Sequence, residues 1–389
     1  MNKIIEADRI QNLPRYLFAE IDRKKKELIK KGVDIINLGI GDPDLPTPEF
    51  IVKRIQKALN NPANHRYPDY EGSSFLRKAV STYYKRRFGH NINPDSEVLI
   101  TIGSKEAIFH LPYAFVNPGD YVIVPDPGYP VYSISTQLIG GKVYRAPLVK
   151  ENRFLIDIKK IPVSILKKAK IIFINYPNNP TGSTGTDRFY RELVNTAKKY
   201  KILIASDFAY SEITFDGYLT PSMFDYDKEK EVSLEFHSLS KLFNMTGFRI
   251  GFVISNSSII DALKRLKTNM DSGASTFIQE GAEEALLKGD KAIKMINEVY
   301  RRRRDIVADF LEKARIKFNY PKGTFYIWSE VPEGYSSISF VQNLMEKSGV
   351  IVTPGNGFGE YGEGYFRIST TIDDNRLREA MRRIKDFLS

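Results

Sequence analysis

One short segment of the sequence combines a lysine with two serines and a following arginine. It runs Ser238-Leu239-Ser240-Lys241, and Arg249 lies eight residues further on. A lysine must be neutral to attack an aldehyde, and a desolvated site with cationic neighbours lowers its pKa. Serine hydroxyls and the arginine fork can bind phosphate oxygens. Each residue alone is best explained as part of a polar loop, but the ordered set indicates imine chemistry beside a bound phosphate.

Two other polar segments directly follow apolar runs. Asn179 lies in the segment 175–182 after the run 171–174, and Asp207 follows the run 202–205. Ligands of open α/β sheets bind beyond the carboxyl ends of the strands, and a carboxylate that ends a buried strand is costly unless it is paired. Both segments are therefore candidates for ligand contacts. The simpler alternatives are a turn in the first segment and a helix cap at Asp207.

The elements that must position these residues form a regular pattern through the middle of the chain. Short apolar runs alternate there with helical stretches, which predicts an α/β layer with a mostly parallel sheet. The runs cover residues 98–102, 121–124, 171–174, 202–205, 233–236 and 250–254.

The two ends of the chain are expected to form a second, smaller unit. Pro14 and Gly32 bound a predicted helix over 14–31, and from about residue 275 longer helices separate strand candidates at 325–328, 350–353 and 365–369. We therefore expect three parts: an N-terminal arm and helix (1–48) packing with the small domain, a large domain (49–285) and a small α+β domain (286–389).

The Ser-x-Ser-Lys segment with its arginine resembles the fold-type-I aminotransferases of class I/II, which depend on pyridoxal 5′-phosphate (PLP). The resemblance extends from about Leu13 to Ile384. It implies a large domain with a mostly parallel seven-stranded sheet between helices, beside a smaller α+β domain. It also implies Lys241 as the catalytic residue that holds PLP covalently. The implied phosphate ligands are Ser238, Ser240 and Arg249.

The same resemblance assigns further cofactor contacts. Asp207 is expected to pair with the ring nitrogen, and Asn179 and Tyr210 to hydrogen-bond the phenolic oxygen. A helix start offers backbone N–H groups to a phosphate. The remaining implied contacts are the backbone of Ser104 and Lys105, the ring-stacking Tyr129, and Tyr67, which reaches the phosphate of the neighbouring subunit. The resemblance thus implies a homodimer with shared active sites.

On the substrate side, the resemblance implies that Gly41, Asn179 and Arg367 lie against the α-carboxylate, to which an arginine can bind with two hydrogen bonds. Several segments are more similar to the LL-diaminopimelate aminotransferases than to the wider family. They are residues 64–72, 235–241, 244–247, 270–273 and 357–367. Those enzymes exchange amino groups between LL-diaminopimelate with 2-oxoglutarate and tetrahydrodipicolinate with glutamate, in lysine biosynthesis.

The second ammonium group of diaminopimelate needs an acceptor. Glu71 or the hydroxyl of Tyr70, just past Tyr67, is the candidate, and the alternative for Glu71 is a surface charge beside a turn glycine. If Glu71 accepts this ammonium, Glu71→Gln is expected to impair diaminopimelate more than glutamate.

Other functions of the same fold remain open. They are a broad-specificity alanine, aspartate or aromatic aminotransferase, a PLP-dependent lyase or synthase, and a PLP-binding regulator. A regulator of this kind resembles a winged-helix segment joined to an aminotransferase domain. Here the resemblance begins almost at Met1, so we do not expect a DNA-reading segment.

Composition narrows the partners further. The net charge is +11, but the basic residues are spread along the chain, which favours small anionic substrates over nucleic acid. The four histidines show no metal-ligand spacing, so we expect no metal site. No apolar run reaches membrane-spanning length, and cysteine is absent, as in many proteins of the reducing cytoplasm.

Overall fold

The computed structural model describes residues 5–11, 13 and 19–389. The helix start predicted at Pro14 lies outside these residues, and the described helix α2 spans Ala19–Lys30. The other helices are α1 Asp8–Gln11, α3 Glu49–Leu59, α4 Ser74–Phe88, α5 Ser104–Phe115, α6 Val131–Leu138, α7 Val163–Leu166, α8 Asp187–Tyr200, α9 Leu239–Leu242, α10 Ser257–Lys267, α11 Thr276–Lys288, α12 Asp290–Lys313, α13 Ser337–Ser348 and α14 Asp374–Leu388.

A seven-stranded sheet forms the centre of the molecule, in the order β2-β8-β7-β6-β5-β3-β4. Its strands are β2 Val98–Thr101, β3 Tyr121–Asp126, β4 Lys142–Pro147, β5 Ala169–Ile174, β6 Leu203–Asp207, β7 Ser233–Ser238 and β8 Gly251–Ile254. All neighbours are parallel except β8, which is antiparallel to both β2 and β7. The predicted mostly parallel α/β sheet is therefore confirmed.

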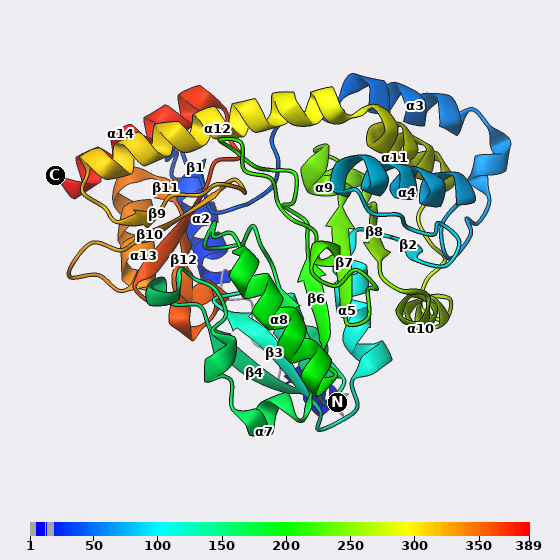
Figure 1. The fold of residues 1–389 in the computed structure, drawn as a ribbon. Coiled ribbons are helices and arrows are strands. Elements are labelled where there is room, and N and C mark those ends of the chain that lie inside the picture. Colours follow the sequence, from blue (N-terminus) through cyan, green and yellow to red (C-terminus); the bar gives the residue numbers. More distant parts are fainter. Residues whose placement is uncertain (1–4, 12, 14–18) are drawn as a thin grey trace.

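Apolar side chains on both faces of this sheet explain why helices cover it on both sides (Figure 1). Along β5, Ile171 and Phe173 pack into one cluster with α5, α6 and α10, whereas Ile172 and Ile174 pack into another with α4, α8 and α11. Successive residues of a strand point to opposite faces, so a continuous apolar run is what a doubly covered strand requires.

The N-terminal segment and the C-terminal third share a second core. Strand β1 (Ile36–Asn37) pairs in parallel with β11 (Val350–Ile351). Beside it lies a four-stranded antiparallel sheet in the order β12-β13-β10-β9, with β9 Phe318–Asn319, β10 Tyr326–Glu330, β12 Thr353–Pro354 and β13 Tyr365–Ser369. The long helix α12 reaches from α11 to this part of the molecule, where it packs along α14 (Figure 1). The domain boundaries after residues 48 and 285 stay predictions.

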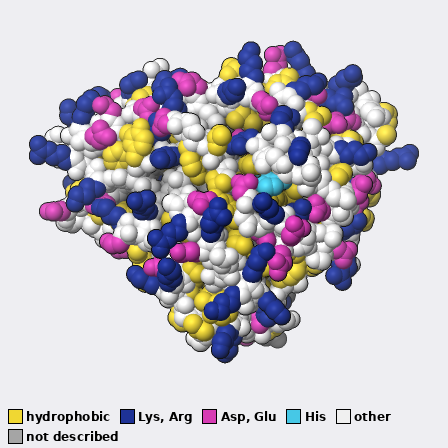
Figure 2. Space-filling model, viewed as in Figure 1, with side chains coloured by type: hydrophobic (Ala, Val, Ile, Leu, Met, Phe, Trp, Pro, Cys, Tyr) yellow, Lys and Arg dark blue, Asp and Glu magenta, His cyan; other side chains and the backbone are white. Residues whose placement is uncertain are grey.

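The surface carries the basic excess in a dispersed form. On the face in Figure 2, Lys and Arg side chains are spread among acidic ones rather than gathered into one patch. No helix in the described ranges is both long and apolar enough to cross a membrane.

Candidate active site

The sheet topology brings the polar segments of the sequence to one edge. Because β8 is antiparallel to both neighbours, the carboxyl ends of β2, β3, β5, β6 and β7 point the same way, and β8 begins there after Arg249. A cavity of about 1120 Å³ lies at this edge. The predicted site residues that line it are Gly41, Ser104, Lys105, Tyr129, Asn179, Asp207, Tyr210, Ser238, Lys241 and Arg367.

An anion-binding turn lies at one end of this cavity. Gly103, with φ +77°, directly precedes α5. A Cβ built on it would lie 2.6 Å from Nη2 of Arg249. The guanidinium of Arg249 donates to the carbonyl of Thr246 over 2.9 Å and to Oγ of Ser240 over 3.5 Å. Within the described chain, no carboxylate forms an ion pair with Arg249. A guanidinium without a carboxylate partner, next to the start of a helix, suits a phosphate.

Asp207, the last residue of β6, lines the cavity with its carboxylate. It is 6% exposed, Oδ2 accepts a hydrogen bond from the Tyr132 hydroxyl over 2.7 Å, and Oδ1 accepts one from the Ala209 backbone over 3.4 Å. Burial raises the pKa of Asp207 to about 6. No cationic side chain of the described residues lies within ion-pair distance, so this carboxylate can accept a cationic ligand group.

The amine of Lys241 lies in the same cavity as this carboxylate and the guanidinium of Arg367. Lys241 belongs to the one-turn helix α9 after β7, and its Nζ donates to the carbonyl of Gly41 over 2.9 Å. The pKa of Lys241 is lowered to about 8, chiefly by burial; Asp42 and Asp207 oppose this shift, whereas Arg367 and Arg249 contribute to it. A lysine with this pKa has a substantial neutral fraction near neutral pH, which nucleophilic attack on a carbonyl carbon requires.

Arg367 is a buried cation on the opposite wall, in the middle of β13. Its Nη1 donates to Oδ1 of Asn179 over 2.6 Å and its Nη2 to the carbonyl of Gly39 over 2.7 Å. The guanidinium carbon lies 4.1 Å from the ring centroid of Tyr326 and 4.7 Å from that of Phe358. Among the side chains that the structure describes, none provides Arg367 with a carboxylate partner. A substrate carboxylate would supply the missing charge.

The sequence did not indicate two further residues of the site, Tyr132 and Tyr326. Tyr132 donates to Asp207, and the hydroxyl of Tyr326 lies 3.2 Å from that of Tyr210. A Cβ on Gly41 would overlap the Tyr326 hydroxyl, so this position requires glycine. Nothing in the sequence distinguishes these tyrosines from core aromatics, because both lie within ordinary apolar segments.

Five predicted residues are not among those that line this cavity within the single chain. Ser240 and Arg249 belong to the anion-binding turn described above, and the other three are Tyr67, Tyr70 and Glu71. Tyr67 is 90% exposed and Tyr70 is 47% exposed. The carboxylate of Glu71 already contacts two cations, Arg77 over 3.2 Å and Lys264. These ion pairs compete with the expected contact between Glu71 and a substrate ammonium, whereas the expectation for the hydroxyl of Tyr70 is unaffected.

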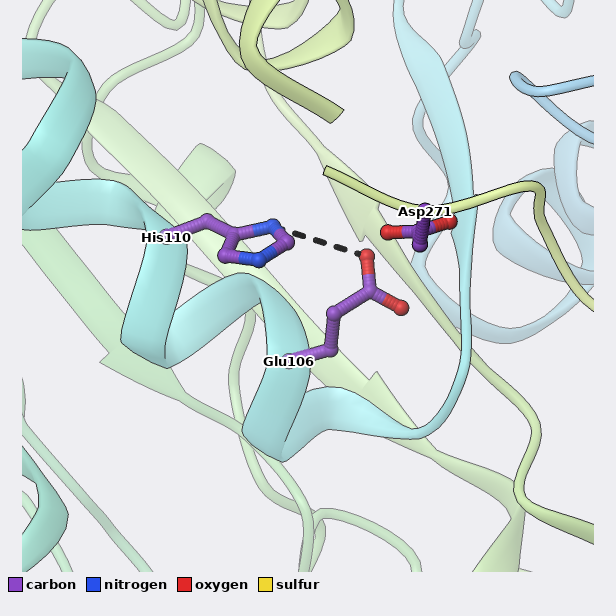
Figure 3. Close-up of side chains that lie close together, drawn as sticks. All are labelled: Glu106, His110 and Asp271. Carbon is purple, nitrogen blue, oxygen red and sulfur yellow. Dashed lines mark ion pairs between the residues drawn. The ribbon is translucent and has the colours of Figure 1, made fainter. Parts of the chain in front are cut away.

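A cluster of potential metal ligands lies behind the anion-binding turn. Glu106, His110 and Asp271 come together there, with His110 Nδ1 3.6 Å from Glu106 Oε1 (Figure 3). The buried ammonium of Lys267 already lies 2.9 Å from Glu106 and 2.5 Å from Asp271. Glu106 also accepts from the backbone N–H of Ile102 over 2.6 Å. The ammonium of Lys267 therefore pairs with both carboxylates of the cluster, which ties the start of α5 to the loop after α10.

Comparisons with known proteins agree with this geometry. A family model described as "Aminotransferase class I and II" matches residues 33–384. The chain is 52% identical to LL-diaminopimelate aminotransferase of Aquifex aeolicus (strain VF5) and 50% identical to that of Halothermothrix orenii, with 98% of each chain covered in both cases. The solved apo structure of BacF from Bacillus subtilis superposes with a TM-score of 0.94 at 37% identity, covering 99% of this chain and 98% of that one. The chain belongs to the class I and II aminotransferases.

Proposed function

We propose that this enzyme is a PLP-dependent LL-diaminopimelate aminotransferase that transfers an amino group to 2-oxoglutarate in lysine biosynthesis. The observation that carries the proposal is the near-full-length similarity to relatives of that name, at 52% and 50% identity. The cavity supports the reaction class independently, because it holds a lysine of lowered pKa together with a buried carboxylate and a buried guanidinium.

The residues around the cavity fit PLP group by group. The anion-binding turn of Gly103, Ser104 and Arg249 suits the phosphate, together with Ser238 and Ser240. Asp207 has no cation of its own among the described residues and suits the ring nitrogen, and Lys241 suits the aldehyde carbon. The remaining proposed contacts are Asn179 and Tyr210 to the phenolic oxygen, Tyr129 to the ring face, and Lys105 through its backbone.

Bound PLP supplies an electron sink that stabilises negative charge at the substrate Cα. The side chains do the rest. Arg367 and Asn179 orient the α-carboxylate, and Gly41 leaves room for it beside Tyr326. The neutral amine of Lys241 takes the Cα proton and returns it to the cofactor side, acting as general base and then acid. Asp207, with a pKa of about 6, is mostly ionised at neutral pH and keeps the group opposite it protonated.

We further propose a cytoplasmic homodimer with shared active sites. Tyr67 is almost fully exposed in the single chain, although the family resemblance gives it a phosphate contact in the neighbouring subunit. The loop that carries Tyr67 and Asp69 packs closely against the loop that carries Gly273. A Cβ on Gly273 would lie only 2.9 Å from the carbonyl oxygen of Asp69. Met270, in that second loop, is 47% exposed, so the two loops offer an apolar surface to a partner.

Mixing two inactive or weakened variants tests the shared site. In a hybrid dimer of Tyr67→Phe and Lys241→Ala chains, one site has both native residues and the other has neither. If each chain completes its partner's site, each hybrid dimer formed by subunit exchange is therefore expected to have about half the activity of a native dimer. A mixture that never exceeds the summed activity of its components would contradict the shared site.

A panel of amino donors tests the substrate. LL-diaminopimelate, alanine, aspartate and phenylalanine are each supplied with 2-oxoglutarate, and glutamate formation is measured, with Lys241→Ala protein as the control without turnover. LL-diaminopimelate is expected to have the highest kcat/KM. If it is no better a donor than alanine or aspartate, the substrate assignment is wrong, whereas the transaminase assignment stands as long as any donor reacts.

A further inference from the structure

A second cavity, of about 430 Å³, lies outside the site described above. One wall is the segment 182–186, which directly follows Thr181 and leads into α8. The other wall is formed by β9 and β10 of the small sheet, including Asn319 and Trp328. The two walls are joined, since Asn319 Nδ2 donates to the carbonyl of Thr181 over 2.7 Å and to Oγ of Ser183 over 2.9 Å. The cavity has the size of a small-molecule site.

The lining of this cavity is rich in aromatic side chains. Trp328 is 1% exposed, and its ring is stacked on that of Tyr365 with centroids 5.2 Å apart. Phe154 and Phe318 add apolar surface.

The charges at the cavity are unbalanced. Lys150, Arg153 and Lys322 line it, against the single carboxylate of Glu330. Lys150 and Glu330 form an ion pair of 2.5 Å and neutralise each other. Neither Arg153 nor Lys322 forms an ion pair with any residue in the described ranges, so the cavity keeps a positive rim. A positive rim attracts anions, and the aromatic lining favours a flat apolar body.

We propose that this cavity binds a small organic anion, a carboxylate carried by a planar apolar group. The carboxylate is bound by Arg153 and Lys322, and the apolar group lies among the aromatic side chains. The site is separate from the cavity that holds Lys241 and goes beyond the proposed transamination. Its ligand would contact both the segment after Asn179 and strand β10, where Trp328 lies directly opposite Arg367.

The sequence provides a built-in reporter for this site, because Trp328 is its only tryptophan. The experiment titrates the holoenzyme with benzoate and follows tryptophan fluorescence. Benzyl alcohol tests the need for the charge, and inorganic phosphate tests the need for the apolar group. The cofactor's visible absorption, recorded in parallel, reports on the cavity of Lys241. A saturable fluorescence change is expected with benzoate, and much weaker responses with the other two compounds.

Two variants assign the response to this cavity. Arg153→Gln combined with Lys322→Gln removes two exposed charges and is expected to weaken benzoate binding about tenfold. Lys228→Gln, at an exposed lysine that lines neither cavity, is the matched control and is expected to bind as the native enzyme does. The proposal is overturned if benzoate gives no saturable change, if the double variant binds benzoate like the control, or if phosphate or benzyl alcohol binds as well as benzoate.

Discussion

Replacing Asp207 with asparagine is expected to stabilise the protein without cofactor while impairing the enzyme. Burial raises the pKa of this carboxyl from 3.8 to about 6, although the hydrogen bonds from Tyr132 and Ala209 and the charge of Lys241 oppose the shift. A difference of about 2 pK units means that the ionised form costs the apoprotein ~3 kcal/mol at pH 7. Asparagine has the same shape without the charge, and its carbonyl oxygen can still accept from Tyr132. The free energy of unfolding of Asp207→Asn apoprotein should therefore rise by up to ~3 kcal/mol.

The sign of the pH dependence makes this prediction sharper. The folded chain holds the proton of Asp207 more tightly than the unfolded chain does. The resulting stability is present below pH 3.8 and is lost as the pH rises through about 6. Asparagine does not titrate, so the difference between variant and native apoprotein should shrink towards zero as the pH falls from 7 to 4.

Urea unfolding of both apoproteins across this pH range measures the stability difference. Asp309→Asn, at an exposed carboxylate, is the matched control and should change the free energy of unfolding by only a few tenths of a kcal/mol, as exposed ion pairs do. In the holoenzyme, loss of the charge-assisted contact to the ring nitrogen costs about 1.5–3 kcal/mol, or roughly 10- to 100-fold in kcat/KM. An Asp207→Asn apoprotein that is no more stable than the native one at pH 7, or an unchanged kcat/KM, would refute the reasoning.

Four further substitutions test separate parts of the site. Lys241→Ala should lower kcat by at least about a thousandfold, since general acid–base and covalent catalysis are lost together, while PLP still binds through the phosphate contacts; normal turnover would exclude Lys241 as the catalytic residue. Arg367→Gln should lower kcat/KM for every amino donor by about a hundredfold, because the carboxylate loses a charged donor pair; an effect on one donor alone would contradict its role as the common carboxylate ligand. Glu71→Gln should lower the free energy of unfolding by about 1 kcal/mol and affect diaminopimelate and glutamate equally, because its carboxylate already binds Arg77 and Lys264. A selective loss of diaminopimelate turnover would instead support Glu71 as the distal ammonium acceptor, and Tyr70→Phe tests the other candidate in the same assay.

The central strands could be predicted because their burial on both faces leaves a visible apolar run. Residues 171–174 are such a run, and they form most of β5. Strand β4 (Lys142–Pro147) was missed because it lies at the edge of the sheet and is only partly buried, so that its residues mix charged and apolar types. The other edge strand, β2, is buried along its whole length and does leave such a run at residues 98–102.

Some residues of the site could likewise be predicted from the sequence, and others could not. Asp207 and Asn179 stand out in the sequence because a polar residue at the end of a buried strand needs a reason. Tyr326 contacts Arg367 and Tyr210 but resembles any core tyrosine until the two sheets are assembled. The ion pair of Glu71 with Lys264 joins segments far apart in the chain, and neither segment indicates the other. Local chemistry is readable from the sequence, whereas long-range partners depend on the fold.

The central claim is that Lys241 and the surrounding cavity transfer an amino group from LL-diaminopimelate through bound PLP. A half-reaction tests it most directly: purified holoenzyme is mixed with LL-diaminopimelate alone, and the visible absorption band of the cofactor is followed over time. We expect the band to be lost completely, faster than with alanine or aspartate, and to return when 2-oxoglutarate is added, while Lys241→Ala protein shows no such cycle. A band that LL-diaminopimelate leaves unchanged, or a full cycle in the Lys241→Ala protein, would contradict the account.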